Sequence, residues 1–298
     1  MTNAALHPLS TVGIIGGGIM GEAMIGGLLS QHVLAPDQII VSDVMQTRLD
    51  ELSAQYHVRT TLRNQDVADA ADTIVLSIKP QMLDKIMPAL HEVMIGASKP
   101  RLVLSILAGV TLSALAEGTR SPHIVRAMPN TPARIGKGIT VWTAAPSVDA
   151  LQKDAARGIL ATFGQEIYVD EEHYLDMATA LSGSGPAYVF LFMEALIDAG
   201  VHMGLPRRMA EQLVVQTVRG AAEYADFTKE HPATLRNQVT SPGGTSAEAL
   251  YHLEKGGLRT VMARGVWAAY QRSLALGAGR KGVTPGKGRN PDKLNDDK

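Results

Sequence analysis

The sequence lacks cysteine altogether and is poor in aromatic residues. None of its 298 residues is Cys, which excludes disulfides, cysteine-ligated zinc and thiol catalysis. The absence is compatible with the reducing cytoplasm, where we expect the protein. Aromatic side chains account for only 4% of the residues, so the hydrophobic core must be built from Ala, Val, Ile, Leu and the 13 Met residues.

Further absences limit the expected partners. The formal net charge is only −1, which gives no general reason to expect nucleic acid. The uninterrupted apolar runs fall well short of the roughly 18 residues that span a bilayer, and the strongest, residues 187–193, is followed by Glu194. We therefore expect no membrane partner. The nine His residues, His123 among them, show no metal-ligand spacing, and no metal site is predicted.

The residues that are present predict a globular protein of two domains. Hydrophobic residues make up 45% and charged residues 19% of the chain, and a domain typically contains about 100–200 residues. The predicted strands are residues 11–15, 38–42, 72–78 and 101–107, with 123–127 and 138–141 as candidates to extend the sheet, and the predicted helices are 19–31 and 47–55. This alternation predicts a doubly wound (Rossmann) α/β domain with a parallel sheet over residues 11–169, after a flexible leader at 1–10.

The second half has a different pattern, with longer segments and more alanine. Residues 188–203 are apolar on nearly every helical face, 207–224 are amphipathic and 258–276 form a further long segment. We predict an all-α domain over residues 170–279. Because a helix that is apolar all round is normally buried, we expect residues 188–203 to pack against another subunit. Residues 280–298 carry six Lys/Arg and three Asp, a net charge of +3, and are predicted to be a disordered basic tail.

A glycine-rich loop follows the first predicted strand and opens the first predicted helix. Gly16, Gly18 and Gly21 form the pattern G-x-G-x-x-G, which in this context is typical of dinucleotide binding. Gly16 permits the tight turn, Gly18 lets the backbone approach a pyrophosphate, and Gly21 allows close packing of helix on strand. The free N–H groups at the helix start favour the phosphates.

The residues after the next strands give conflicting indications of the cofactor. Asp43 ends the second strand, where an acid usually binds the ribose hydroxyls and selects NAD. Arg48 is close enough in sequence to reach a 2′-phosphate, although an exposed helix residue is the favoured interpretation. Ser77–Pro80 and Ile106–Gly109 follow two other strands, and ligands bind beyond the carboxyl ends of such strands. A plain strand terminus remains the alternative for Lys79.

A second motif, Ser241-Pro-Gly-Gly-Thr-Ser246, precedes a helix in the α domain. Thr245 and Glu248 have capping-box spacing, which explains the motif as a well-capped helix start. Its two glycines and the helix start also form a nest of N–H groups suited to a carboxylate, with the Ser246 hydroxyl beside it. By chemistry alone the two interpretations remain equal.

Several motifs together resemble those of the pyrroline-5-carboxylate reductase family. They are the glycine loop with Met20 before Gly21, Ile78-Lys-Pro80, Arg126-Ala-Met-Pro-Asn-Thr-Pro132, Leu181-Ser-Gly-Ser-Gly-Pro-Ala-Tyr188, Gly204-Leu-Pro-Arg207 and Ser241-Pro-Gly-Gly244. They occur in the family's order, and the resemblance covers residues 12–276. It implies reduction of Δ1-pyrroline-5-carboxylate to L-proline by NADPH or NADH. It also implies an intertwined homodimer, which can assemble further, with each site built from two chains.

The resemblance also assigns site residues. Substrate-binding roles fall on Ser241, Gly243, Gly244, Thr245 and Ser246, and the hydroxyl of Ser246, the expected catalytic residue, bonds the ring nitrogen. The implied cofactor contacts are Gly16, Gly17, Gly18, Ile19, Met20, Asn64, Ser77, Ile78, Lys79, Pro80, Ile106, Leu107 and Ala108, with Asp43 at the ribose.

Two departures from the family pattern concern these assignments. Ser246 stands where the family usually has Thr, which keeps the hydroxyl. Asp43 stands where NADP-preferring members often carry a small polar residue, so the choice between NADH and NADPH stays open.

Two alternative functions fit the sequence less well. A β-hydroxyacid dehydrogenase shares the glycine loop and Met20, but it needs a Lys early in the helix after its second glycine motif, and residues 184–192 contain none. A nucleotide-sensing module without catalysis would need no carboxylate pocket, and the Ser241 loop argues against it.

Overall fold

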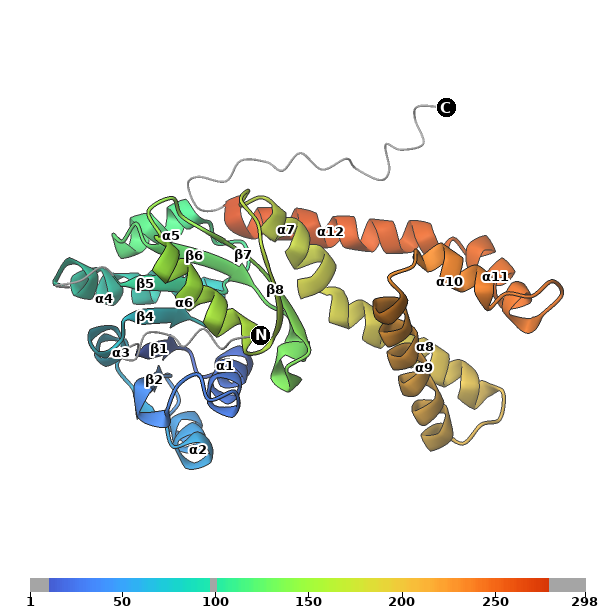
Figure 1. The fold of residues 1–298 in the computed structure, drawn as a ribbon, viewed down its shortest axis with the longest axis horizontal. Coiled ribbons are helices and arrows are strands. Elements are labelled where there is room, and N and C mark those ends of the chain that lie inside the picture. Colours follow the sequence, from blue (N-terminus) through green and yellow to red (C-terminus); the bar gives the residue numbers. More distant parts are fainter. Residues whose placement is uncertain (1–10, 97–100, 279–298) are drawn as a thin grey trace. The chain divides into compact units, whose positions relative to one another are not determined.

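A computed structural model describes residues 11–96 and 101–278, and its elements are shown in Figure 1. By contacts, the described residues divide into two units, 11–184 with 269–278, and 185–268. The sequence prediction placed the boundary near residue 169 and assigned all of residues 170–279 to the second domain. The predicted leader at 1–10 and basic tail at 280–298 lie outside the described residues.

The first unit is built on an eight-stranded sheet with the order β3-β2-β1-β4-β5-β6-β7-β8. Its centre is formed by β1 (Val12–Ile15), β2 (Ile39–Ser42), β4 (Thr73–Leu76) and β5 (Leu102–Ser105), each buried at every residue. These strands pair in parallel. Nearly continuous apolar runs form such strands because helices cover both faces of the sheet. The predicted doubly wound domain is confirmed.

The outer strands differ from the central ones. β6 (Ile124–Met128) continues the parallel set, whereas β7 (Gly138–Ala144) pairs antiparallel to it, so the sheet is mixed at this side. Two strands that the sequence analysis did not predict complete the edges, β3 (Arg59–Thr61) and β8 (Gly164–Tyr168). Neither has the apolar run of a central strand, and both pair through the backbone with one neighbour.

The helices of the first unit form two groups around the sheet (Figure 1). One group is α1 (Ile19–Ser30) with α2 (Gln46–Tyr56) and α6 (Ala150–Ala161), and the other is α3 (Asn64–Ala70), α4 (Leu83–Gly96) and α5 (Leu112–Thr119). Short 3-10 turns lie at Pro36–Gln38, Pro80–Met82 and Thr131–Ile135, and α7 (Tyr174–Ala178) continues into a π-helical turn, Thr179–Gly183. One apolar cluster runs through the sheet and both helix groups.

A buried ion network joins four segments of the first unit. Arg126 on β6 is 2% exposed, and its guanidinium donates to Glu172 at 2.9 Å and to Asp176 at 3.0 Å. Glu172 also accepts the N–H of Leu112 at the start of α5, and Asp176 accepts the hydroxyl of Ser273. A buried charge is tolerated only when it is paired and hydrogen-bonded, and this network satisfies that condition.

The second unit is helical, as predicted. It contains α8 (Gly185–His202), α9 (Arg207–Thr228), α10 (Pro232–Gln238), α11 (Thr245–Lys255) and most of α12 (Leu258–Ala278). Helices α8 and α9 pack side by side (Figure 1). Gly200 makes this approach possible, because a Cβ there would lie 3.2 Å from the Cβ of Ala210.

Helix α8 is exposed within the single chain. Phe190 and Leu191 are 61% and 67% exposed in the single chain, and the sequence analysis expects this apolar segment to pack against another subunit. Among the described residues, one helical stretch, Tyr174–His202, is long and apolar enough to cross a membrane by length and composition, and only 6% of its most apolar window is buried. Large contiguous apolar patches on protein surfaces often mark interaction sites.

Candidate active site

The ends of four strands meet at one edge of the sheet in the first unit. The N–H of Gly16 donates to Ser42 O at 2.8 Å, that of Ser77 to Ile15 O at 2.9 Å, and that of Ile106 to Leu76 O at 3.2 Å. The chain order reverses between β1 and β4. Open α/β sheets bind ligands at such a switch point, outside the carboxyl ends of the strands.

The glycine loop at this edge has the geometry that its residues require. Gly16 has φ +103°, and a Cβ there would lie 2.5 Å from Ser77 O. A Cβ on Gly21 would lie 2.3 Å from Gly16 O, so this glycine allows α1 to pack closely on the loop. By contrast, a Cβ on Gly18 would meet nothing within 4 Å. The loop is therefore tight behind Gly16 and Gly21 and open at Gly18.

Two features of this edge fit a dinucleotide. Helix α1 begins after Gly18 with no side-chain cap, so its first N–H groups and the positive end of its dipole remain open to phosphate. The hydroxyl oxygen of Ser77 is buried and has no hydrogen-bond partner among the described residues. Buried polar atoms normally have a partner, and a bound ligand at the edge would supply one here.

The carboxylate of Asp43 is held by two backbone groups. Its Oδ2 accepts the N–H of Gly17 at 2.9 Å, and its Oδ1 accepts the N–H of Met45 at 3.0 Å. A carboxylate has about four acceptor positions, so each oxygen keeps one for a ligand hydroxyl. Asp43 is therefore oriented beside the glycine loop before any ligand binds.

The guanidinium of Arg48 is held by the glycine loop and two acids. Its Nε donates to Gly17 O at 2.7 Å, and its terminal nitrogens bind Glu22 at 2.5 Å and Glu51 at 2.9 Å. Although partial burial lowers it, the hydrogen bonds to Glu51 and Glu22 raise the pKa of Arg48 above its ordinary value. Burial and the Glu22 charge raise the pKa of Tyr56, whose hydroxyl donates to Glu22 at 3.2 Å. The interpretation of Arg48 as an exposed helix residue is wrong, since its side chain is 22% exposed.

The remaining predicted cofactor residues lie at the same edge. Asn64 begins α3, and the Ser42 hydroxyl donates to its Oδ1 at 2.7 Å. Lys79 is exposed and precedes the turn Pro80–Met82. Leu107 is only 2% exposed and packs in the core, so it can meet a ligand only through its backbone.

Exposed apolar side chains follow two of the strands. Val44 and Met45 come just after β2 and are 83% and 59% exposed, and Leu62, just after β3, is 56% exposed. The strand ends are neighbours, because Ser42 pairs with Thr61. Apolar surface beside a polar loop suits a flat ring such as adenine, and the sequence analysis missed this signal.

In the second unit, the turn before α11 leaves that helix open at its start. The N–H of Gly244 donates to Ser241 O at 3.0 Å, and Gly243 has φ +69°, as a type II turn with Pro242 before it requires. Gly244 is the N-cap and makes no side-chain cap bond. The predicted capping box is therefore wrong, because Thr245 is already the first helical residue.

This start of α11 has the character of an anion site. A glycine cap offers no side-chain acceptor, so the first N–H groups of the helix point to solvent with the positive dipole end behind them. A Cβ on Gly244 would lie 2.6 Å from the Ser241 hydroxyl oxygen, which shows how closely that hydroxyl approaches the cap. Ser246 is the second residue of the helix and is partly buried.

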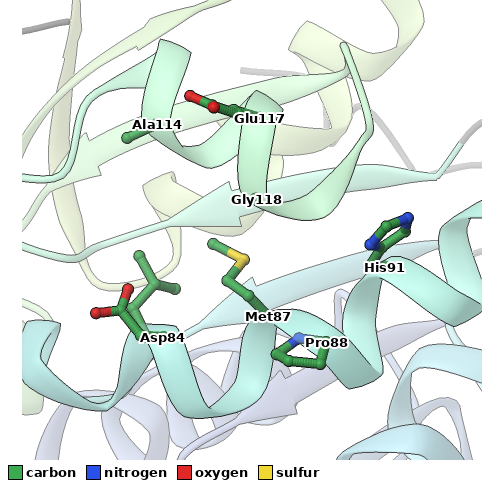
Figure 2. Close-up of a pocket in the computed structure, with 8 residues that line it drawn as sticks. Asp84, Met87, Pro88, His91, Ala114, Glu117 and Gly118 are labelled. Carbon is green, nitrogen blue, oxygen red and sulfur yellow. The ribbon is translucent and has the colours of Figure 1, made fainter. Parts of the chain in front are cut away.

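A further hollow lies elsewhere in the first unit. It measures about 560 Å³ and lies between α4 and α5 (Figure 2). Asp84, Met87, His91 and Glu117 line it, and none of the predicted site residues does. Among the described residues no group of three or more His, Asp or Glu is placed to hold a metal.

Comparison with known proteins gives consistent results for both units. The family model described as pyrroline-5-carboxylate reductase dimerisation matches residues 172–276, and the one described as NADP oxidoreductase, coenzyme F420-dependent, matches residues 11–109. A pyrroline-5-carboxylate reductase of Synechocystis sp. is 44% identical over 89% of this chain and 98% of its own length. The chain belongs to the pyrroline-5-carboxylate reductase family.

Solved structures of the family agree with this membership. The pyrroline-5-carboxylate reductase of Coxiella burnetii is 38% identical, with a TM-score of 0.82 over 90% of this chain and 98% of that one. The Plasmodium falciparum enzyme, solved with NADP bound, is 30% identical, with a TM-score of 0.81 over 90% of this chain and 98% of that one. The resemblance stated from the sequence motifs is confirmed.

Proposed function

We propose that this chain reduces Δ1-pyrroline-5-carboxylate to L-proline with NADH or NADPH, the last step of proline biosynthesis. The observation that carries the proposal is the uncapped start of α11 after Ser241-Pro-Gly-Gly, in a chain whose other unit has an open dinucleotide loop. One open helix start suits a pyrophosphate and the other suits a small carboxylate. The family membership supports both assignments.

In the first unit, backbone N–H groups and side-chain oxygens at the strand ends contact the dinucleotide. The N–H groups at the start of α1, after Gly18, receive the pyrophosphate. Asp43 accepts ribose hydroxyls, and the Ser77 hydroxyl gains the partner that it lacks. The backbone of Ile106–Ala108 approaches from the neighbouring strand end, because Ile106 is tied to β4.

At the substrate end, the carboxylate binds the N–H groups after Gly244 and the hydroxyl of Ser241. The hydroxyl of Ser246, on the same first turn, donates to the ring nitrogen. A carboxylate at a helix start is stabilised by the dipole, and two anchoring points fix the plane of a small ring. The turn thus orients the imine carbon.

The reaction needs few protein groups. When bound, NADH or NADPH supplies a hydride, which forms the new C–H bond as the C=N π bond breaks toward nitrogen. A protonated imine is already electrophilic, so the nitrogen of the product has its proton without a strong general acid. The chain contributes positioning and the exclusion of water, and Ser246 holds the nitrogen in place.

We further propose a homodimer that places residues of two chains at each site, in the cytoplasm and without nucleic acid or membrane. The exposed apolar face of α8 supports this, since it lies within the region matched by the dimerisation family model. Covering that face with a second copy buries it without a bilayer.

Isotope transfer tests the proposed reaction most directly. The purified chain is mixed with Δ1-pyrroline-5-carboxylate and with NADH or NADPH deuterated at the transferred position. We expect L-proline with deuterium at the former imine carbon by mass spectrometry. Absence of product with either dinucleotide at saturating substrate would overturn the assignment.

A further inference from the structure

Each of the three nitrogens of the Arg48 guanidinium already donates to an acceptor of the protein. Its guanidinium is bonded to Gly17 O, Glu22 and Glu51 at 2.5–2.9 Å. Paired guanidinium and carboxylate groups largely cancel each other's field at a distance. Arg48 therefore acts as a clamp on the Gly17 carbonyl.

Gly17 is held from both sides at once. Asp43 accepts its N–H at 2.9 Å, while Arg48 donates to its carbonyl at 2.7 Å. Rotating Asp43 away to admit a phosphate would break the bonds to Gly17 and Met45 together. The carboxylate is thus fixed where the ribose of a dinucleotide would lie, beyond the end of β2.

The neighbouring strand end adds one exposed cation, which lies beside an acid. Arg63, which follows β3, has its Nε 3.6 Å from Asp66. Four carboxylates (Glu22, Asp43, Glu51, Asp66) and three guanidiniums (Arg48, Arg63 and, beyond Tyr56, Arg134) lie around this end of the loop, a formal net charge of −1. A 2′-phosphate carries further negative charge, whereas two ribose hydroxyls are hydrogen-bond donors that suit a carboxylate.

We infer that this chain selects NADH over NADPH, and that Arg48 is a positioning residue for the glycine loop which does not bind a 2′-phosphate. The inference rests on the proposed function, which supplies the dinucleotide. It resolves the conflict between Asp43 and Arg48, because the acid is available to the ribose and the base is committed to Glu22 and Glu51.

Equilibrium binding of the two dinucleotides tests this independently of turnover. Dissociation constants for NADH and NADPH are measured on the full chain by nucleotide fluorescence. We expect NADH to bind about tenfold or more tightly, as one repulsive charge contact at the ribose implies. The ratio should shrink at high salt, since exposed charges are screened. Equal or tighter binding of NADPH overturns the inference.

Three variants distinguish an Arg48 that positions Gly17 from an Arg48 that binds the 2′-phosphate. Arg48→Met should weaken both NADH and NADPH, because both need the Gly17 loop, with a further loss of no more than severalfold for NADPH from the two uncompensated acids. Asp43→Ser should weaken NADH about tenfold, the effect of losing hydrogen bonds to a charged group, and should tighten NADPH. Glu51→Gln should tighten NADPH severalfold and leave NADH unchanged, since it frees part of the Arg48 charge.

A matched control is available on α6. Asp154 pairs with Arg157 three residues on at 2.8 Å and is 63% exposed, like Glu51 at 64%. Asp154→Asn should leave the NADH-to-NADPH ratio of dissociation constants unchanged. Loss of NADPH binding with NADH binding unchanged, in Arg48→Met or in Arg63→Met, would overturn the inference. Strong NADH binding without turnover of the imine would instead leave it standing and defeat the proposed reaction.

Discussion

The two units of the chain differ in how they bury their residues. The central strands of the first unit are buried at every position, whereas α8 and α9 of the second unit together bury only Gly200 and Ala210. Helical stability in proteins comes mostly from packing of an apolar face. The first unit therefore has its own core, and we expect the stability of the second to depend on a surface from outside the single chain, as the proposed dimer would supply.

Of the changes that test this comparison, replacing the buried Arg126 of the first unit should have the largest effect on the free energy of unfolding. Arg126→Met leaves Asp176 and Glu172 without their ion-pair partner. Breaking a buried ion pair in this way costs about 3–5 kcal/mol of unfolding free energy. Urea unfolding followed by circular dichroism measures it. The exposed pair broken in Asp154→Asn should cost less than about 1 kcal/mol. Equal costs in the two variants would contradict the role of the network.

Two leucines test the source of stability in each unit. Leu76→Ala, in β4, should cost about 2–5 kcal/mol at any protein concentration, because Leu76 is fully buried within one chain. Leu191→Ala, in α8, should cost about 1.5–3 kcal/mol, and only where a partner covers it, so its effect should depend on protein concentration. Urea titrations at several concentrations measure both effects.

A matched exposed leucine completes this test. Leu151 on α6 is 78% exposed, compared with 67% for Leu191. Leu151→Ala should change the unfolding free energy by less than about 0.5 kcal/mol, as surface substitutions do. A chain that is fully active as a monomer in sedimentation at micromolar concentration would refute the need for a partner.

A smaller effect is expected in turnover when the Ser246 hydroxyl is removed. Ser246→Ala should lower kcat about ten- to a hundredfold, equivalent to roughly 1.5–3 kcal/mol for a hydrogen bond to a partly charged nitrogen. The melting temperature should hardly change, since Ser246 makes no cap bond. Ser246→Thr should restore most of the activity. Steady-state kinetics with thermal melts decide the matter, and wild-type turnover in the alanine variant would exclude the role.

The smallest effect concerns the cap of α11. Because Gly244 is the N-cap, Thr245→Ala should change stability by less than about 0.5 kcal/mol. Thr111 in the first unit is a true N-cap that accepts the N–H of Ala114, and Thr111→Ala should cost about 1 kcal/mol. Thermal melts of both variants measure these changes. A larger loss of stability in Thr245→Ala than in Thr111→Ala would show that Thr245 caps the helix.

The central sheet and the glycine loop could be predicted because their signals are local. Strand β4 is an apolar run and Gly16 follows such a run directly, so each is visible in a few residues. Strand β3 consists of Arg-Thr-Thr and β8 of Gly-Gln-Glu-Ile-Tyr. These edge strands are held by backbone pairing with one neighbour, and their side chains show no buried pattern.

The parts of the site that were missed depend on contacts between distant residues. Arg48 meets Glu22 across 26 positions, and no spacing rule connects residues so far apart. The cap of α11 was misassigned by one residue because Thr245 and Glu248 match the capping pattern. The turn closed by Gly244 N–H on Ser241 O places the helix start earlier than that pattern implies.

The last helix has a consequence for how the chain folds as it is made. Gly109 has φ +72°, and a Cβ there would lie 2.9 Å from the Cβ of Leu276, so the end of α12 packs directly on the loop after β5. Ser273 completes the buried ion network through Asp176. On the ribosome, the first unit therefore gains its last element only after residues 185–268 have been made. A nascent chain ending at Ser184 would expose the surface on which the end of α12 packs.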